Sequence, residues 1–174
     1  MLNGKCLVNE IRTRIPMKNP QNTIDKMMSG LQEFIPEVYY VGYDKNIVNL
    51  GLPINPLTQP ETLQKINSEY DYDYLIDFHA TTPEAKSSGV AFGSPYFDHK
   101  VSVSIAIYQN KTGNMVYYQN IELEEHDGNS DEDYLEDQDG VVFTRSSENL
   151  MKIGIKKCTN DLRKSIKRKI ESGP

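Results

Sequence analysis

The stretch at residues 100–123, KVSVSIAIYQNKTGNMVYYQNIEL, decides the fold class. Its first half alternates apolar residues with small or polar ones, which is the period-two pattern of a β-strand with one buried face. The apolar residues of this half are Val101, Val103, Ile105 and Ile107. A turn containing Gly113 leads to a second strand-like run at 115–123, so the pattern predicts a β-hairpin. One polar face on the first strand predicts a sheet that is covered on one side only.

The chain upstream of the hairpin alternates strand and helix signals. We expect strands at 5–13, 37–43 and 73–81, because these runs are rich in β-branched and aromatic residues. Apolar residues at helical spacing predict helices at 22–34 and from about 60 to 70. A weaker strand signal lies at 88–93.

Two caps are expected at the starts of these helices. Asn22 is the expected N-cap of the first helix. The spacing of Thr58 and Glu61 is that of a capping box, with Pro60 in the first turn. Residues 44–58 contain glycine and prolines and are expected to be a loop.

The last element is a helix that begins near residue 146. Apolar residues recur in it at spacings of three and four, which is the stripe of an amphipathic helix. They are Met151, Ile155, Cys158, Leu162, Ile166 and Ile170. We expect this stripe to cover the apolar face of the hairpin. The fold class is therefore α/β or α+β, a mixed sheet with helices mainly on one face, in the order β-α-β-α-β-β-β-α.

Length and charge narrow the class of protein. The 174 residues predict one domain spanning 1–174, and a net charge of −6 argues against a nucleic-acid binder. No apolar run is long enough to span a membrane, and no basic-then-apolar leader opens the chain. Cys6 and Cys158 are expected to be packed thiols, although a bridge between them stays open.

An acidic segment separates the hairpin from the last helix. Ten of the eighteen residues at 122–139 are Asp or Glu, so we expect a flexible solvated loop at about 124–140. Asp127, Asn129 and Asp131 begin like a calcium loop. The pattern then fails, because its sixth position is Glu rather than Gly and its twelfth is Gln rather than Glu. Weak calcium binding there stays an alternative to a solvated loop.

The pair Asp77 and His79 is the sharpest candidate for chemistry, because residues two apart on a strand share a face. The stretch DFHATT at 77–82 resembles the Asp-His-Thr segment of zinc-dependent deacylases related to carboxypeptidases. The first zinc ligands of those enzymes come from an upstream His-x-x-Glu, but His79 is the first histidine of this chain. A zinc site could still be assembled from Asp77, His79 and His99. The alternative is a histidine that is hydrogen-bonded at a strand end.

Four segments in order resemble the group formed by the TolB amino-terminal domain, CsgG and LpoB. They are the helix at 22–34 with EVYYVGY, PETLQKINSEYDYDYLIDFHA, the hairpin quoted above, and SSENLMKIGIKKCTNDLRKSIKRKI. The resemblance covers about residues 5–170. The first strand is a poor match, and the acidic segment is an insertion.

The resemblance implies a bacterial cell-envelope domain, often anchored by an upstream lipid, that binds other proteins and has no catalytic residues. We therefore expect no enzyme activity, no cofactor, and a partner that is another envelope protein or a second copy. The expected location is the periplasm or the inner face of the outer membrane. Two alternatives remain: a metal-dependent hydrolase using Asp77 and His79, and a small cytoplasmic module that self-associates.

Overall fold

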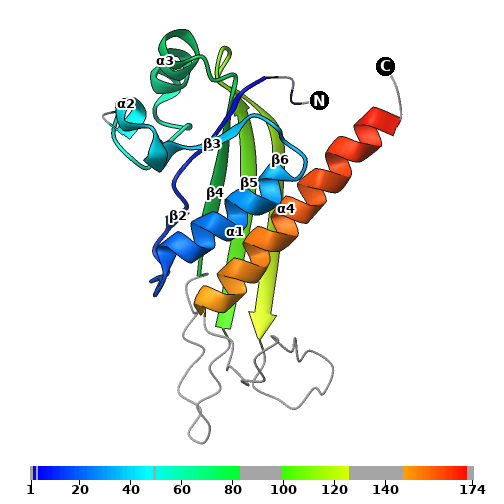
Figure 1. Ribbon diagram of the computed structural model, residues 1–174. Helices are drawn as coiled ribbons and strands as arrows, with labels where there is room; N and C mark the ends of the chain where they lie inside the picture. Colours follow the sequence, from blue (N-terminus) through cyan, green and yellow to red (C-terminus); the bar gives the residue numbers. More distant parts are fainter. Residues whose placement is uncertain (1, 3, 49, 83–98, 126–146, 172–174) are drawn as a thin grey trace, which may run out of the picture.

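The computed structural model describes residues 2, 4–48, 50–82, 99–125 and 147–171 (Figure 1). The weak strand signal at 88–93 and nearly all of the acidic segment lie outside these residues. Asp127, Asn129 and Asp131 are among the residues that are not described, so the calcium hypothesis stays a prediction.

One mixed sheet of six strands forms the centre of the described structure. The strands are β1 (Cys6–Val8), β2 (Arg12–Thr13), β3 (Val38–Tyr40), β4 (Tyr74–Thr81), β5 (His99–Gln109) and β6 (Asn114–Glu125). Their order across the sheet is β3-β1-β4-β5-β6, with β2 also pairing with β4. β1 is parallel to both of its neighbours, whereas β4, β5 and β6 are antiparallel. The predicted hairpin and the predicted mixed sheet are confirmed.

The predicted strand at 5–13 is two short strands, β1 and β2, and Asn9 lies between them. Its buried side-chain amide donates to the backbone oxygen of Ile54 at 2.7 Å and accepts from the backbone N–H of Ile54 at 3.0 Å. This pair of hydrogen bonds ties the loop after residue 50 to the sheet.

The helices are α1 (Pro20–Gln32), α2 (Lys45–Val48), α3 (Pro60–Tyr70) and α4 (Ser147–Glu171), with a 3-10 turn, η1 (Val41–Tyr43), after β3. Both predicted caps are wrong, because a proline fixes each first turn one residue after the true cap. Asn19 caps α1 and accepts from the N–H of Asn22, while Gln59 precedes α3 without a side-chain cap bond. The four-residue α2 lies in the segment expected to be a loop.

Helices α1 and α4 lie together on one face of the sheet (Figure 1). α4 packs against β5 and β6, and Leu150, Met151, Ile155, Cys158 and Leu162 are buried there. At Gly154 an added Cβ would lie only 2.4 Å from the Cγ2 atom of Val103. The predicted role of the last helix as a cover is confirmed. None of the described helices combines the length and apolar character needed to cross a bilayer.

The opposite face of the sheet is covered only in part. In the hairpin, Ser102 Oγ lies 2.8 Å from Asn120 Oδ1, and the Tyr118 side chain is exposed. At β4 both faces are buried, since Leu75 and Asp77 are as inaccessible as Ile76 and Phe78. The expectation of one covered side therefore holds for β6 and is wrong for β4, and in β5 Ala106 and Tyr108 on the polar face are also buried.

Candidate functional site

The carboxylate oxygens of Asp77 accept hydrogen bonds from two residues of the same chain. Arg12 donates from Nε and Nη2 to both oxygens, and Asn9 Nδ2 donates to Oδ1 at 2.8 Å. Asp77 is only 1% exposed. A buried carboxylate needs such a partner, because an unpaired charge in this place would be costly. Asp77 therefore links β4 to Arg12 of β2 and to Asn9, which lies between β1 and β2.

His79 lies two residues along β4, half-buried and opposite Arg12 of β2. Burial lowers its pKa, and the nearby positive charge of Arg12 lowers it further. The described residues offer no hydrogen-bond partner to its ring, so the strand-end hydrogen bond is not seen. The side chain of His99 lies outside the described residues. Among the described residues, no cluster of three His, Cys, Asp or Glu side chains is placed to hold a metal ion.

Cys6 and Cys158 are both free thiols and both buried, one in β1 and the other in α4. Burial raises the pKa of each thiol to about 12. A thiol with so high a pKa is not a nucleophile at neutral pH. The expectation of packed thiols is confirmed.

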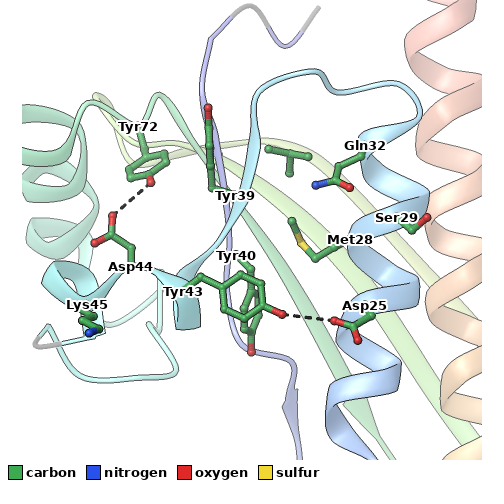
Figure 2. Close-up of a pocket in the computed structure, with 11 residues that line it drawn as sticks. Asp25, Met28, Ser29, Gln32, Tyr39, Tyr40, Tyr43, Asp44, Lys45 and Tyr72 are labelled. Carbon is green, nitrogen blue, oxygen red and sulfur yellow. Dashed lines mark hydrogen bonds between the residues drawn. The ribbon is translucent and has the colours of Figure 1, made fainter.

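A pocket of about 540 Å³ lies along β3, which is an edge strand of the described sheet. Figure 2 shows side chains of α1 on one side of β3 and those of Asp44, Lys45 and Tyr72 on the other, while Tyr43 points toward Asp25 of α1. We call this pocket the β3 groove. It is lined by Asp25, Met28, Ser29, Gln32, Val38, Tyr39, Tyr40, Tyr43, Asp44, Lys45 and Tyr72.

Four tyrosines form two edge-to-face aromatic pairs in the β3 groove. Tyr39 and Tyr72 meet edge to face, with ring centroids 5.8 Å apart, and Tyr40 and Tyr43 do so at 5.2 Å. Such pairs stabilise their own arrangement. Tyr39 is nevertheless 46% exposed and Tyr43 is 63% exposed. The groove thus presents preformed aromatic surface to solvent.

Two carboxylates flank the groove and have neutral hydrogen-bond donors around them. Asp25 Oδ1 accepts from Gln21 Nε2 at 2.7 Å and from the Tyr43 hydroxyl at 3.4 Å. Asp44 Oδ2 accepts from the Tyr72 hydroxyl at 3.3 Å, and burial together with this carboxylate raises the pKa of Tyr72. No described Lys or Arg side chain forms an ion pair with either carboxylate.

The backbone of β3 adds polar groups to the groove. The N–H of Cys6 donates to the oxygen of Glu37 at 2.8 Å, and Cys6 is paired with Val38 in a parallel register. In such a ladder alternate residues face the partner strand. The amide groups of Val38 and Tyr40 therefore face away from β1. Both residues line the groove.

Sequence reasoning missed the β3 groove, because its walls come from three separate segments. The available signal was the run VYYVGY at 38–43, which has three tyrosines in six residues. A segment with that composition and two exposed aromatic residues is typical of a contact surface.

Comparisons with known proteins give structural likeness only. No protein-family model and no curated protein matches the chain. Lipoprotein GNA1162 from Neisseria meningitidis is 13% identical, with a TM-score of 0.48, over 75% of this chain and 88% of that one. The PelC dodecamer from Paraburkholderia phytofirmans is 10% identical, with a TM-score of 0.47, over 92% of this chain and 87% of that one.

The LpoB C-terminal domain from Escherichia coli is 13% identical, with a TM-score of 0.45, over 70% of this chain and 84% of that one. LpoB belongs to the group of proteins that the sequence resembles. The resemblance to TolB and CsgG stays a prediction. Identities and TM-scores this low cannot transfer a function, so the candidate function rests on the geometry of the β3 groove.

Proposed function

We propose that this chain is a non-enzymatic protein-interaction module of a bacterial cell envelope, and that it binds its partner through the β3 groove. The observation that carries the proposal is the groove itself: an edge strand, exposed tyrosines in edge-to-face aromatic pairs and two carboxylates without an ion-pair partner among the described residues. Tyrosine is enriched in protein interfaces, because it supplies a large contact area at a small entropic cost.

The groove suits a protein ligand better than a small molecule. It lies open along a strand and is not enclosed, and its polar groups are spread over α1, β3 and η1–α2. Small-molecule sites are concave and bury most of their ligand. A partner protein can reach the exposed rings of Tyr39 and Tyr43 together.

Site-specific photo-crosslinking in the native bacterium tests this proposal. A benzoylphenylalanine in place of Tyr43 is expected to give one discrete protein adduct. The same group in place of Tyr118, an exposed strand tyrosine at the other end of the sheet, is the matched control and is expected to give none. No adduct at Tyr43, or the same adducts at both positions, would refute the proposal.

The envelope location is supported by the sequence resemblance and is tested separately. Fractionation of the native bacterium is expected to recover the full-length protein with the periplasmic or membrane fraction. Recovery in the cytosol alone would favour the alternative of a cytoplasmic module, and would leave the role of the groove to the crosslinking result.

A further inference from the structure

We infer that the β3 groove binds an extended segment of the partner, which pairs with the open edge of β3 as an added strand and carries a Lys or Arg side chain toward the groove carboxylates. This inference rests on the proposed function and specifies the ligand of the same site. It follows from the backbone of β3, from the two walls and from the charges.

The backbone of β3 is the first reason. The register with β1 turns the N–H and C=O groups of Val38 and the N–H of Tyr40 toward the groove. The C=O of Tyr40 is at the N-cap of η1 and accepts the first bond of that turn. The N–H and C=O of Val38 and the N–H of Tyr40 have no hydrogen bond to another described residue. Buried or half-buried backbone groups need partners. An extended main chain supplies donors and acceptors at the right repeat, as in recognition by strand addition.

The two walls are the second reason. Successive side chains of a strand point to opposite faces. An added strand would therefore place one residue against Met28 and Ser29 of α1 and the next against Tyr39 and Tyr72 (Figure 2). Both walls offer apolar surface, so the partner segment is expected to carry apolar or β-branched residues beside its cation. Because β3 is short and η1 follows it, pairing would extend over only a few residues.

The charges are the third reason. Asp25 stands on the α1 wall and Asp44 on the opposite wall, so a cation on either face of the added strand meets a carboxylate. Both carboxylates accept hydrogen bonds from neutral groups. Lys45 is the single cationic residue among those that line the groove. Charge complementarity across an interface selects the partner and speeds its association.

The test uses peptides selected from a random dodecapeptide phage library against the purified chain. Peptides that enrich are expected to contain Lys or Arg within a β-branched or aromatic run. One such peptide is then methylated at each backbone nitrogen in turn, and its affinity is measured by fluorescence anisotropy. Strand addition predicts a period of two, with about tenfold or greater loss at alternate positions and little change between them.

Three variants of the chain locate the binding. Val38→Pro removes an N–H that faces the groove while the β1 ladder keeps its bonds, and it is expected to weaken the peptide about tenfold or more. The double change of Asp25→Asn and Asp44→Asn is expected to weaken it severalfold at low salt and less at high salt. Tyr118→Ala is the control and is expected to bind normally. Circular dichroism and thermal unfolding verify that each variant is folded.

The outcomes separate the two proposals. A flat methylation scan, unchanged binding by Val38→Pro or no enriched peptide at all would overturn strand addition. If Val38→Pro fails to fold, the methylation scan decides by itself. A specific Tyr43 adduct combined with a flat scan would keep the interaction module and refute its strand-like ligand. A methylation scan with a period of two but no adduct at Tyr43 would refute the interaction module. The ability of the groove to bind an extended peptide would still stand.

Discussion

At the scale of single residues, a buried polar cluster has a structural role. The cluster consists of Asp77, Asn9 and Arg12. Asp77 and His79 do share one strand, as their spacing predicts, but the Asp77 carboxylate accepts from Arg12 and Asn9. Arg12 lies 65 residues away in sequence. Asp77, which belongs to the pattern that suggested a zinc site, is therefore the acidic partner of Arg12 in an ion pair. No local feature of the sequence distinguishes these two roles.

Replacing Arg12 with Ala is expected to destabilise the protein by about 3 kcal/mol, since it leaves the carboxylate of Asp77 buried without its cation. Chemical denaturation followed by circular dichroism measures the change. Arg14→Ala is the matched control, because Arg14 is exposed, and it is expected to stay within about 0.5 kcal/mol of the parent. Equal effects of the two substitutions would contradict a structural role for the Arg12–Asp77 pair.

At the scale of the element, α4 confirms the helical stripe that the sequence predicts. Leu162 is buried, Ile166 is half-buried at the margin, and Lys157 is exposed. Leu162→Ala is expected to cost about 2–5 kcal/mol, because it opens a cavity between α4 and the sheet. Lys157→Glu on the outer surface of the same helix is the control and is expected to change the stability by less than about 1 kcal/mol. Thermal unfolding compares them, and a silent Leu162→Ala would mean that the stripe is not packed.

Gly154 sets how closely α4 approaches β5. Alanine normally stabilises a helix relative to glycine, but here its Cβ would lie 2.4 Å from Val103 Cγ2. We expect Gly154→Ala to destabilise by about 1–3 kcal/mol through overpacking, and Val103→Ala in the same chain to restore part of the loss. Gly30→Ala in α1 is the comparison, because its nearest atom is the Thr159 Cγ2 at 3.3 Å. A stabilised Gly154→Ala variant would show that the contact can relax.

At the scale of the whole molecule, two carboxylates that belong to α4 connect this helix to the rest of the described fold. Glu148 accepts from Lys152 and from the N–H of Lys18, and the Lys152 bond is the main reason why its pKa is lowered. Asp161 accepts from Lys164 and from Gln119 of β6, and these bonds likewise lower its pKa. Both groups thus bind protons less readily in the folded chain than in the unfolded one.

The unfolding free energy is therefore expected to fall as the pH drops below the ordinary values of 4.5 for Glu and 3.8 for Asp. The stabilisation is present above these values and is lost as the pH passes through the lowered folded-state values. Urea unfolding at a series of pH values measures the slope. Glu148→Gln removes one of the two groups and should make the slope shallower; an unchanged slope would contradict this assignment.

The sequence by itself determined the elements whose signal is local. The hairpin, β4, α1, α3 and α4 follow from apolar periods of two or of three to four residues, because these periods reflect burial of one face of each element. The sequence also indicated a mixed sheet with helices mainly on one side. The caps at Asn22 and Thr58 were wrong, since the prolines at 20 and 60 shift the helix starts.

Only the tertiary structure decided which segments meet. Because β1 lies between β3 and β4, β3 is at an edge of the described sheet. The β3 groove lies where that edge passes α1 and Tyr72. The pairing of Arg12 with Asp77 arises in the same way. Contacts of this kind join residues far apart in the chain, whereas periodicity reports only which side of an element is buried. For that reason the sequence predicted the core and the structure revealed the candidate site.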